Sequence, residues 1–165
     1  MGSKKITKCL LAVYIIALIF IILFKMQLPF QSMPHIRNIN LIPFGASVII
    51  NGSIDFDEII ANFIAFIPFG IFTGMLSEKK SVLAKTAPAF LTSLLLETAQ
   101  FVFAIGASDI TDLLMNTLGG MAGTGCYMVL SKIFGNKTNK ILNMICMLGG
   151  GMLLLLVGIL IAVNL

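Results

Sequence analysis

The sequence contains no tryptophan and few charged residues, and both shortages narrow the class of protein. Only 11% of its 165 residues are charged, whereas 58% are hydrophobic and the mean hydropathy is +1.04. Because soluble globular domains carry about 25% charged residues, this composition predicts an integral membrane protein. The missing tryptophan leaves only a thin aromatic belt for the membrane interface.

Two further absences exclude classes of function. The three cysteines, Cys9, Cys126 and Cys146, have no paired spacing, so the sequence predicts neither a zinc site nor a disulfide framework. No glycine-rich phosphate loop follows a predicted strand, and the basic residues collect outside the apolar runs. We therefore expect no nucleic-acid partner.

Five apolar runs are long enough to cross a hydrocarbon core, which needs about 20 residues. The runs cover residues 9–24, 59–76, 86–105, 110–130 and 142–163, and the fourth is rich in glycine. They predict an all-α fold, an integral membrane helical bundle of five transmembrane helices. The length of 165 residues leaves no room for a second folded domain, so we expect residues 1–165 to form a single domain.

Between the first two runs lies a shorter apolar segment, residues 41–50. Its length is typical of an interfacial or re-entrant segment and is too short for a crossing. Pro29, Pro34 and Pro43 prevent a long helix through this region. We expect an outer re-entrant or interfacial segment here.

The distribution of basic residues predicts the orientation. A cytoplasmic N-terminus leaves only Lys25 and Arg37 outside, as the positive-inside rule favours. Nine lysines then lie inside: Lys4, Lys5, Lys8, Lys79, Lys80, Lys85, Lys132, Lys137 and Lys140. With five crossings, the C-terminus is extracytoplasmic.

Polar residues at helical spacing form one stripe on each of two neighbouring helices. In the third run the spacing i, i+4, i+7 aligns Ser93, Glu97 and Gln100. In the fourth run the spacing i, i+3, i+7 aligns Asp109, Asp112 and Asn116. A short turn, residues 106–108, joins the two helices, so we expect the stripes to lie near each other at the outer leaflet.

Glu97 is the most informative of these residues, because a carboxylate at membrane depth costs about 2.5 kcal/mol or more. The spans contain no Lys or Arg to neutralise it. It is therefore protonated, hydrated or bound to a cation, and it could act as a proton donor or acceptor. The alternative is a neutral structural glutamic acid that hydrogen-bonds Gln100 or a backbone carbonyl.

The other polar residues allow two interpretations. Asp109 could simply cap the fourth helix, with Asp112 in its first turn. Asp109 and Asp112, together with Asn116 and Glu97, could instead hold a divalent cation through oxygen ligands. The amides of Asn62, Gln100 and Asn116 could bind a substrate or form hydrogen bonds between helices.

Glycines that follow Asn116 in the fourth run predict close helix packing. Gly119 and Gly123 are four residues apart and form a small-xxx-small surface. A neighbouring helix can approach the backbone there.

Several motifs in order resemble those of the VanZ-like family, named for a protein associated with resistance to the glycopeptide teicoplanin. They span residues 40–125, and agreement among several blocks is more specific than any one of them. The blocks are Asn40-Leu-Ile-Pro-Phe44, Asn62 with Phe66-Ile-Pro-Phe-Gly70, Glu97-x-x-Gln100, and Asp109-Ile-x-Asp112-x-x-x-Asn116-x-x-Gly119-Gly120-x-x-Gly123.

The resemblance implies a multi-pass protein of the bacterial cytoplasmic membrane that lowers susceptibility to teicoplanin-type lipoglycopeptide antibiotics. It does not imply an enzyme activity. Family members often have a basic residue just before the Asp motif, where this chain has Gly106-Ala107-Ser108. Arg37, from the long outer region, could replace it.

Two hypotheses for the mechanism follow. In the first, Glu97, Asp112 and Asp109 are catalytic residues acting on a lipid or lipid-linked envelope component. The substrate-binding residues would then be Asn40, Asn62, Gln100, Asn116 and Arg37. In the second, the same groups form a non-enzymatic binding module, transporter component or scaffold that alters antibiotic access. The expected partners are membrane lipids and a lipid-linked cell-wall precursor or lipoglycopeptide, and a divalent cation is a candidate cofactor.

Overall fold

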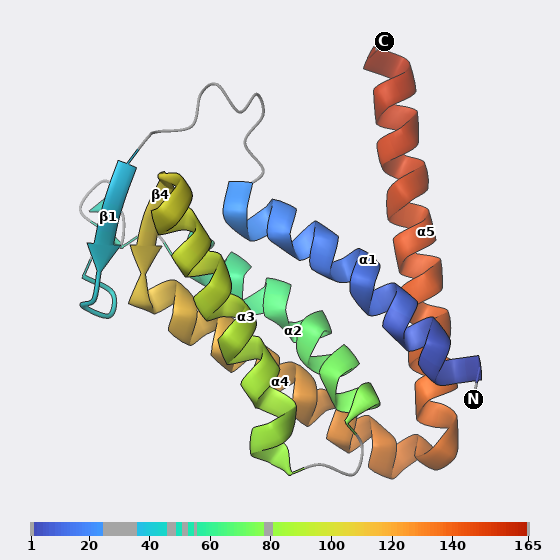
Figure 1. Cartoon of the computed structure of the whole chain (residues 1–165). Coiled ribbons are helices and arrows are strands. Elements are labelled where there is room, and N and C mark those ends of the chain that lie inside the picture. The colour runs from blue at the N-terminus through green and yellow to red at the C-terminus, as the bar shows by residue number, and fades with distance from the viewer. Residues whose placement is uncertain are drawn as a thin grey trace.

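The structure, a computed structural model, describes residues 2–24, 36–45, 49–50, 53–54, 56–77 and 81–164. The side chains of Arg37 and of residues 152–164 lie outside this description. Helices dominate the described part (Figure 1): α1 Gly2–Phe24, α2 Asp57–Leu76, α3 Val82–Phe103, α4 Ile110–Phe134 and α5 Thr138–Asn164, with the 3-10 turn η2 Gly135–Lys137. The short strands are β1 Ile36–Asn40, β2 Ile49–Ile50, β3 Ser53–Ile54 and β4 Ile105–Asp109.

The prediction of an all-α membrane protein is confirmed, whereas the count of five crossings is not matched. The described residues contain four helical runs that are long and apolar enough to cross a membrane. The fourth run, Ile110–Gly151, joins α4, η2 and the beginning of α5 without an intervening loop. The protein is therefore a multi-pass membrane protein in which the last two predicted spans, α4 and α5, follow each other through η2 without a loop.

The prediction of a short turn at residues 106–108 is wrong, because these residues belong to a strand. α3 ends at Phe103, because Ala104 adopts a left-handed conformation (φ 55°) and its N–H bonds to Gln100 O and Phe101 O. The next residues form β4 and pair in parallel with β1, with Asn40 opposite Asp109. The backbone groups just beyond α3 thus find partners in a segment about 70 residues earlier in the chain, which no local pattern reveals.

The apolar segment at residues 41–50 is only partly described. Its first half forms a turn after β1 in which Gly45 N–H donates to Ile42 O at 2.9 Å. Residues 46–48 lie outside the description, and Ile49–Ile50 pairs antiparallel with Ser53–Ile54. Leu41 and Ile42 are exposed. Insertion of this segment into the membrane stays a prediction.

The closest helix packing joins α2 and α4, and glycines make it possible. A Cβ atom at Gly119 would overlap the carbonyl oxygen of Phe63, and one at Gly123 would overlap that of Ile67. On α2, a Cβ at Gly70 would overlap the backbone of Gly120. The predicted small-residue surface of α4 is therefore confirmed, and the helix that packs against it is α2.

Apolar packing fixes the remaining helices around this pair. Leu18 and Ile22 of α1 join Phe66 and Phe69 of α2 in a buried cluster. A second cluster connects α2, α4 and α5: Phe72, Met75, Tyr127 and Leu142. The clusters arrange α1 and α5 beside the central pair.

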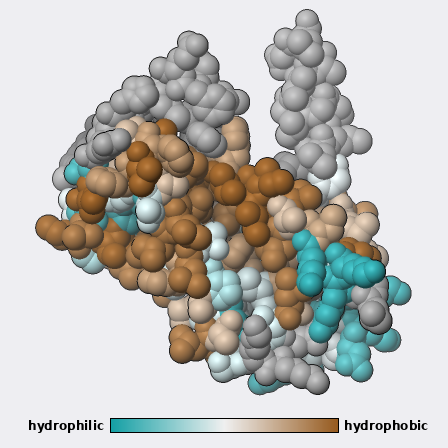
Figure 2. Space-filling view, viewed as in Figure 1, coloured by the Kyte–Doolittle hydropathy of each residue, from teal (hydrophilic) through white to brown (hydrophobic). Residues whose placement is uncertain are grey.

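The outer surface is strongly apolar, as a lipid environment requires. Figure 2 shows hydrophobic residues over the middle of the visible face and a hydrophilic patch at the lower right, near the N-terminus of Figure 1. Exposed leucines such as Leu83 and Leu95 contribute to that apolar surface. The described lysines gather at the end where α1, α3 and α5 begin and α4 ends: Lys4, Lys5, Lys8, Lys85, Lys132, Lys137 and Lys140.

The α2–α4 contact predicts opposite effects for two glycine substitutions on α4. Gly123→Ala should lower the free energy of unfolding by about 1–3 kcal/mol, because the new methyl group meets backbone that cannot rotate away. Gly125→Ala is the matched control, because nothing lies within 4 Å of its Cβ position. It should be neutral or stabilise by about 0.5–1 kcal/mol, since alanine loses less backbone entropy than glycine.

Thermal unfolding of the purified full chain in detergent measures both substitutions. Equal behaviour of the two variants would show that the α2–α4 contact is looser than the structure has it.

Candidate functional site

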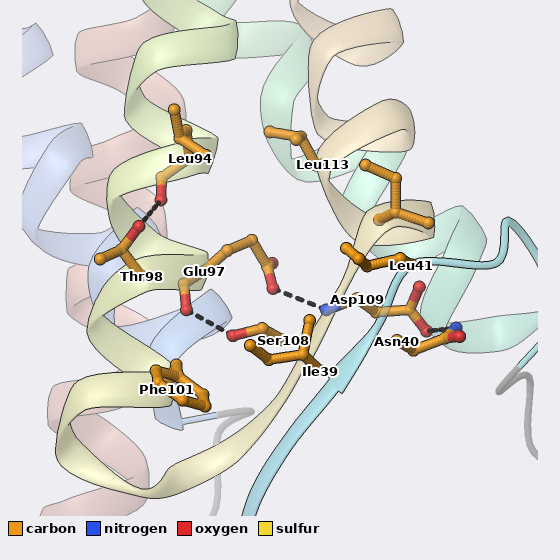
Figure 3. Close-up of a pocket in the computed structure, with 11 residues that line it drawn as sticks. Ile39, Asn40, Leu41, Leu94, Glu97, Thr98, Phe101, Ser108, Asp109 and Leu113 are labelled. Carbon is orange, nitrogen blue, oxygen red and sulfur yellow. Dashed lines mark hydrogen bonds between the residues drawn. The ribbon is translucent and has the colours of Figure 1, made fainter.

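The first cavity of interest lies at the end of the bundle formed by β1, β4 and the beginning of α4 (Figure 3), and has a volume of about 310 Å³. Leucine, isoleucine and phenylalanine side chains make most of its wall, and polar residues supply the rest. It is lined by Ile39, Asn40, Leu41, Leu94, Glu97, Thr98, Phe101, Ser108, Asp109, Ile110 and Leu113. The cavity thus has an amphipathic lining.

Glu97 enters this cavity from α3 and is 6% exposed. Its Oε2 accepts a hydrogen bond from the backbone N–H of Asp109 at 2.9 Å (Figure 3). Ser108 Oγ donates to the carbonyl oxygen of Glu97 at 2.6 Å. These two bonds tie the outer part of α3 to β4, so the carboxyl group is held in one orientation rather than left to move in the cavity.

Asp109 has a clear structural task. Its Oδ1 accepts from the N–H of Thr111 at 2.7 Å, which makes Asp109 the N-cap of α4 as the capping interpretation predicts. Its Oδ2 accepts from Asn40 Nδ2 at 3.1 Å, which joins β1 to the same helix end. Both carboxylate oxygens therefore already accept hydrogen bonds from the protein.

The turn after β1 is also held to α4, through a residue that the sequence did not single out. Thr111 Oγ1 accepts from the N–H of Phe44 at 2.9 Å. Phe44 has φ 60°, a left-handed conformation that is unusual for a bulky residue and is maintained by its surroundings. No local signal marks Thr111, because its partner lies 67 residues away.

Two of the amide side chains named in the sequence analysis, Asn116 and Gln100, lie deeper in the bundle and form hydrogen bonds to different helices. Asn116 is fully buried, and its Nδ2 donates to Ser93 Oγ at 2.9 Å, so the two predicted stripes do meet at this level. Gln100 is 1% exposed, and its Nε2 donates to the carbonyl oxygen of Ile22 on α1 at 3.1 Å. These are hydrogen bonds between helices, the structural alternative for the amides.

Asp112 belongs to a second cavity, of about 350 Å³, on a different side of α4. Ile21, Ile22 and Ala61 contribute apolar walls, and Asn62 lies beside Asp112 in the lining. The first two residues of α2, Asp57 and Glu58, add two more carboxyl groups. Sequence reasoning did not predict this second acidic cavity, because its members come from three helices.

The structure does not bring together the three carboxyl groups proposed for a divalent cation. Glu97 and Asp109 line the first cavity, whereas Asp112 lines the second. Within the described part of the chain, no group of three or more His, Cys, Asp or Glu side chains is arranged to hold a metal ion. The donor set therefore does not fit a cation bound by all three.

Arg37 is placed by its backbone only. The β1–β4 register sets it opposite Gly106, the position just before the Asp motif. Its side chain lies outside the description, so a role in substrate binding stays a prediction.

Comparison with known proteins identifies the family of the chain. The chain is 39% identical over 137 residues to Protein VanZ of Enterococcus faecium, an alignment that covers 82% of this chain and 81% of that protein. No solved structure matches the chain. A profile of the VanZ/LLP1 family matches residues 11–131, which include α2, α3, β4 and most of α4. The chain therefore belongs to the VanZ/LLP1 family.

Proposed function

We propose that this protein lowers susceptibility to teicoplanin-type lipoglycopeptide antibiotics by binding a lipid or lipid-linked envelope component in the cavity around Glu97. The observation that carries the proposal is the position of that carboxyl group. It is buried at the edge of a mostly apolar cavity and held by the N–H of Asp109. A costly polar group in such a place is typical of a functional site in a membrane protein.

The lining favours an amphiphilic ligand. Leu94, Phe101 and Leu113 offer a surface for an acyl or prenyl chain, while Glu97 offers a carboxyl group for the hydroxyl, amide or ammonium groups of a head. A volume of about 310 Å³ is at the lower end of the range for small-molecule sites, roughly 300–1,000 Å³. The cavity therefore accommodates part of a lipid, and the rest would remain in the bilayer.

The roles of the site residues differ. Glu97 is the group that we assign to ligand contact, and to acid or base chemistry if a reaction occurs. Asp109 and Asn40 are positioning residues, because their side chains hold β1 against the beginning of α4. Asp112 and Asn62 would serve the second cavity, and Gln100 and Asn116 would hold α1, α3 and α4 together.

A non-enzymatic binding or scaffold function is the second candidate. It is favoured by the hydrogen bonds of Asp109, whose two carboxylate oxygens are both engaged by the protein and are poorly suited to accept a substrate proton. In this case ligand binding alone would alter antibiotic access.

We propose that the end with β1 and β4 is extracytoplasmic and that the protein lies in the bacterial cytoplasmic membrane. The lysines at the opposite end support this orientation through the positive-inside rule. The cavity around Glu97 would then open toward the outer leaflet, where lipid-linked wall precursors and lipidated antibiotics are found.

Isosteric carboxamide variants test which cavity matters. In cells that express the protein at matched levels, Glu97→Gln should abolish protection against teicoplanin, because it removes the acid while keeping an oxygen for the Asp109 N–H. Asp112→Asn tests the second cavity in the same way. Thr117→Val is the control, since the Thr117 hydroxyl donates to Leu113 O within the same helix at 2.7 Å.

The measurement is the minimum inhibitory concentration of teicoplanin, beside that of a glycopeptide without an acyl chain. Full protection by both carboxamide variants would refute a role for either cavity. Mass spectrometry of envelope lipids then separates the two candidate functions. A protein that is enzymatic produces a new species that disappears with Glu97→Gln, and one that only binds leaves the lipid composition unchanged.

Cysteine labelling tests the orientation. In a variant whose three cysteines are replaced, Phe44→Cys should react with a membrane-impermeant maleimide in intact cells, because Phe44 is exposed at the β1 end. Lys137→Cys, exposed in η2, should react only after the membrane is permeabilised. The reverse pattern would invert the proposed topology.

A further inference from the structure

A third cavity lies at the opposite end of the bundle, where the described lysines gather. Its volume is about 360 Å³, and its lining is largely polar, unlike that of the Glu97 cavity. The beginning of α3, the end of α4, η2 and the beginning of α5 meet around it. Its lining residues are Lys85, Tyr127, Ser131, Gly135, Asn136 and Asn139.

Lys85 is the unusual member of this lining, because only 6% of its surface is exposed. Lysines near a membrane surface normally extend their ammonium groups into water. Among the described residues, the Lys85 side chain makes no hydrogen bond and no ion pair. Lys85 lines the cavity, and none of the other lining residues is an Asp or Glu, so the lining carries a positive charge that an anion would balance.

The helix ends around Lys85 do not supply that negative charge fully. Lys85 lies in the first turn of α3, where the helix dipole is positive and disfavours a cation. The end of α4 is negative, but two of its carbonyl groups, those of Leu130 and Ser131, already have donors from beyond the helix. Gly135 N–H bonds to Ser131 O, and Thr138 Oγ1 bonds to Leu130 O at 3.3 Å and to Gly135 O at 2.8 Å.

Other groups at the cavity favour an anion with several oxygens. α5 begins at Thr138, whose N–H already bonds to Gly135 O in η2, and the following N–H groups of this first turn have no acceptors within α5 itself. The amide of Asn136, exposed in η2, can donate at the rim of the cavity. Exposed Lys132, Lys137 and Lys140 surround this end and raise the local positive potential.

We propose that this cavity binds a phosphate group through Lys85, either in the head group of an anionic phospholipid or as free phosphate. Lysine is a common phosphate ligand, and basic pockets between membrane helices bind anionic lipid head groups. The site shares no lining residue with the Glu97 cavity and does not require the function proposed for it.

The test uses the purified full chain in detergent. Native mass spectrometry measures the binding of phosphatidylglycerol against zwitterionic phosphatidylcholine, and thermal unfolding measures the effect of inorganic phosphate against chloride at equal ionic strength. Selective phosphatidylglycerol binding supports a lipid source, and stabilisation by inorganic phosphate supports a soluble one. Absence of both effects refutes the proposal.

Substitutions locate the binding. Lys85→Gln should weaken the phosphate or phosphatidylglycerol affinity about tenfold or more, as expected for the loss of a charge-assisted hydrogen bond. Lys140→Gln removes the same charge from an exposed position outside the lining and should change the affinity little. An equal loss in both variants, or no loss in Lys85→Gln, would overturn the assignment to this cavity.

If Lys85→Gln fails to fold, two other variants still test the site. Asn136→Ala changes an exposed residue of the lining and should also weaken binding, whereas Lys85→Arg should retain it. Unchanged affinity in Asn136→Ala, together with loss of binding in Lys85→Arg, would refute recognition by charge at this site.

Discussion

The contact between the backbones of α2 and α4 is the constraint on which the rest of the structure depends. Gly119 and Gly123 allow carbonyl groups of α2 to lie where side chains would otherwise be. Thr124 Oγ1 adds a hydrogen bond to Gly70 O at 3.3 Å across the same contact. In lipid, where apolar burial contributes little to helix association, such close packing and hydrogen bonds are what hold helices together.

The first turns of α4 contribute to two separate groups of polar residues. Asp109, at the beginning of the helix, forms hydrogen bonds with Glu97 and Asn40. Asp112, on a different side of the helix, lines the second cavity together with Asn62. Asn116, deeper in the bundle, bonds to Ser93 and keeps α3 against α4. The polar cluster that looks single in the sequence is therefore two cavities separated by one helix.

The outer end of the bundle is completed by a long-range connection. β1 pairs with β4, and Asp109 and Thr111 hold the segment that follows β1 through Asn40 and Phe44. These contacts position Glu97, because the N–H that it accepts belongs to the residue shared by β4 and the cap of α4. The candidate site thus depends on backbone pairing as much as on its side chains.

The sequence alone determined the membrane class, the approximate position of the helices and the buried faces of α3 and α4, and it offered the capping role of Asp109 as one of two interpretations. Each of these follows from composition or from a spacing of three or four residues, which are local properties. Only the tertiary structure decided that α2 is the partner of the glycine surface and that Ile105–Asp109 forms a strand. It also decided that Glu97 and Asp112 face different cavities, and that Lys85 is buried. These features depend on which distant segments pack together. The spacing of polar residues along a helix indicates which face is buried, but it does not indicate which helix packs against that face.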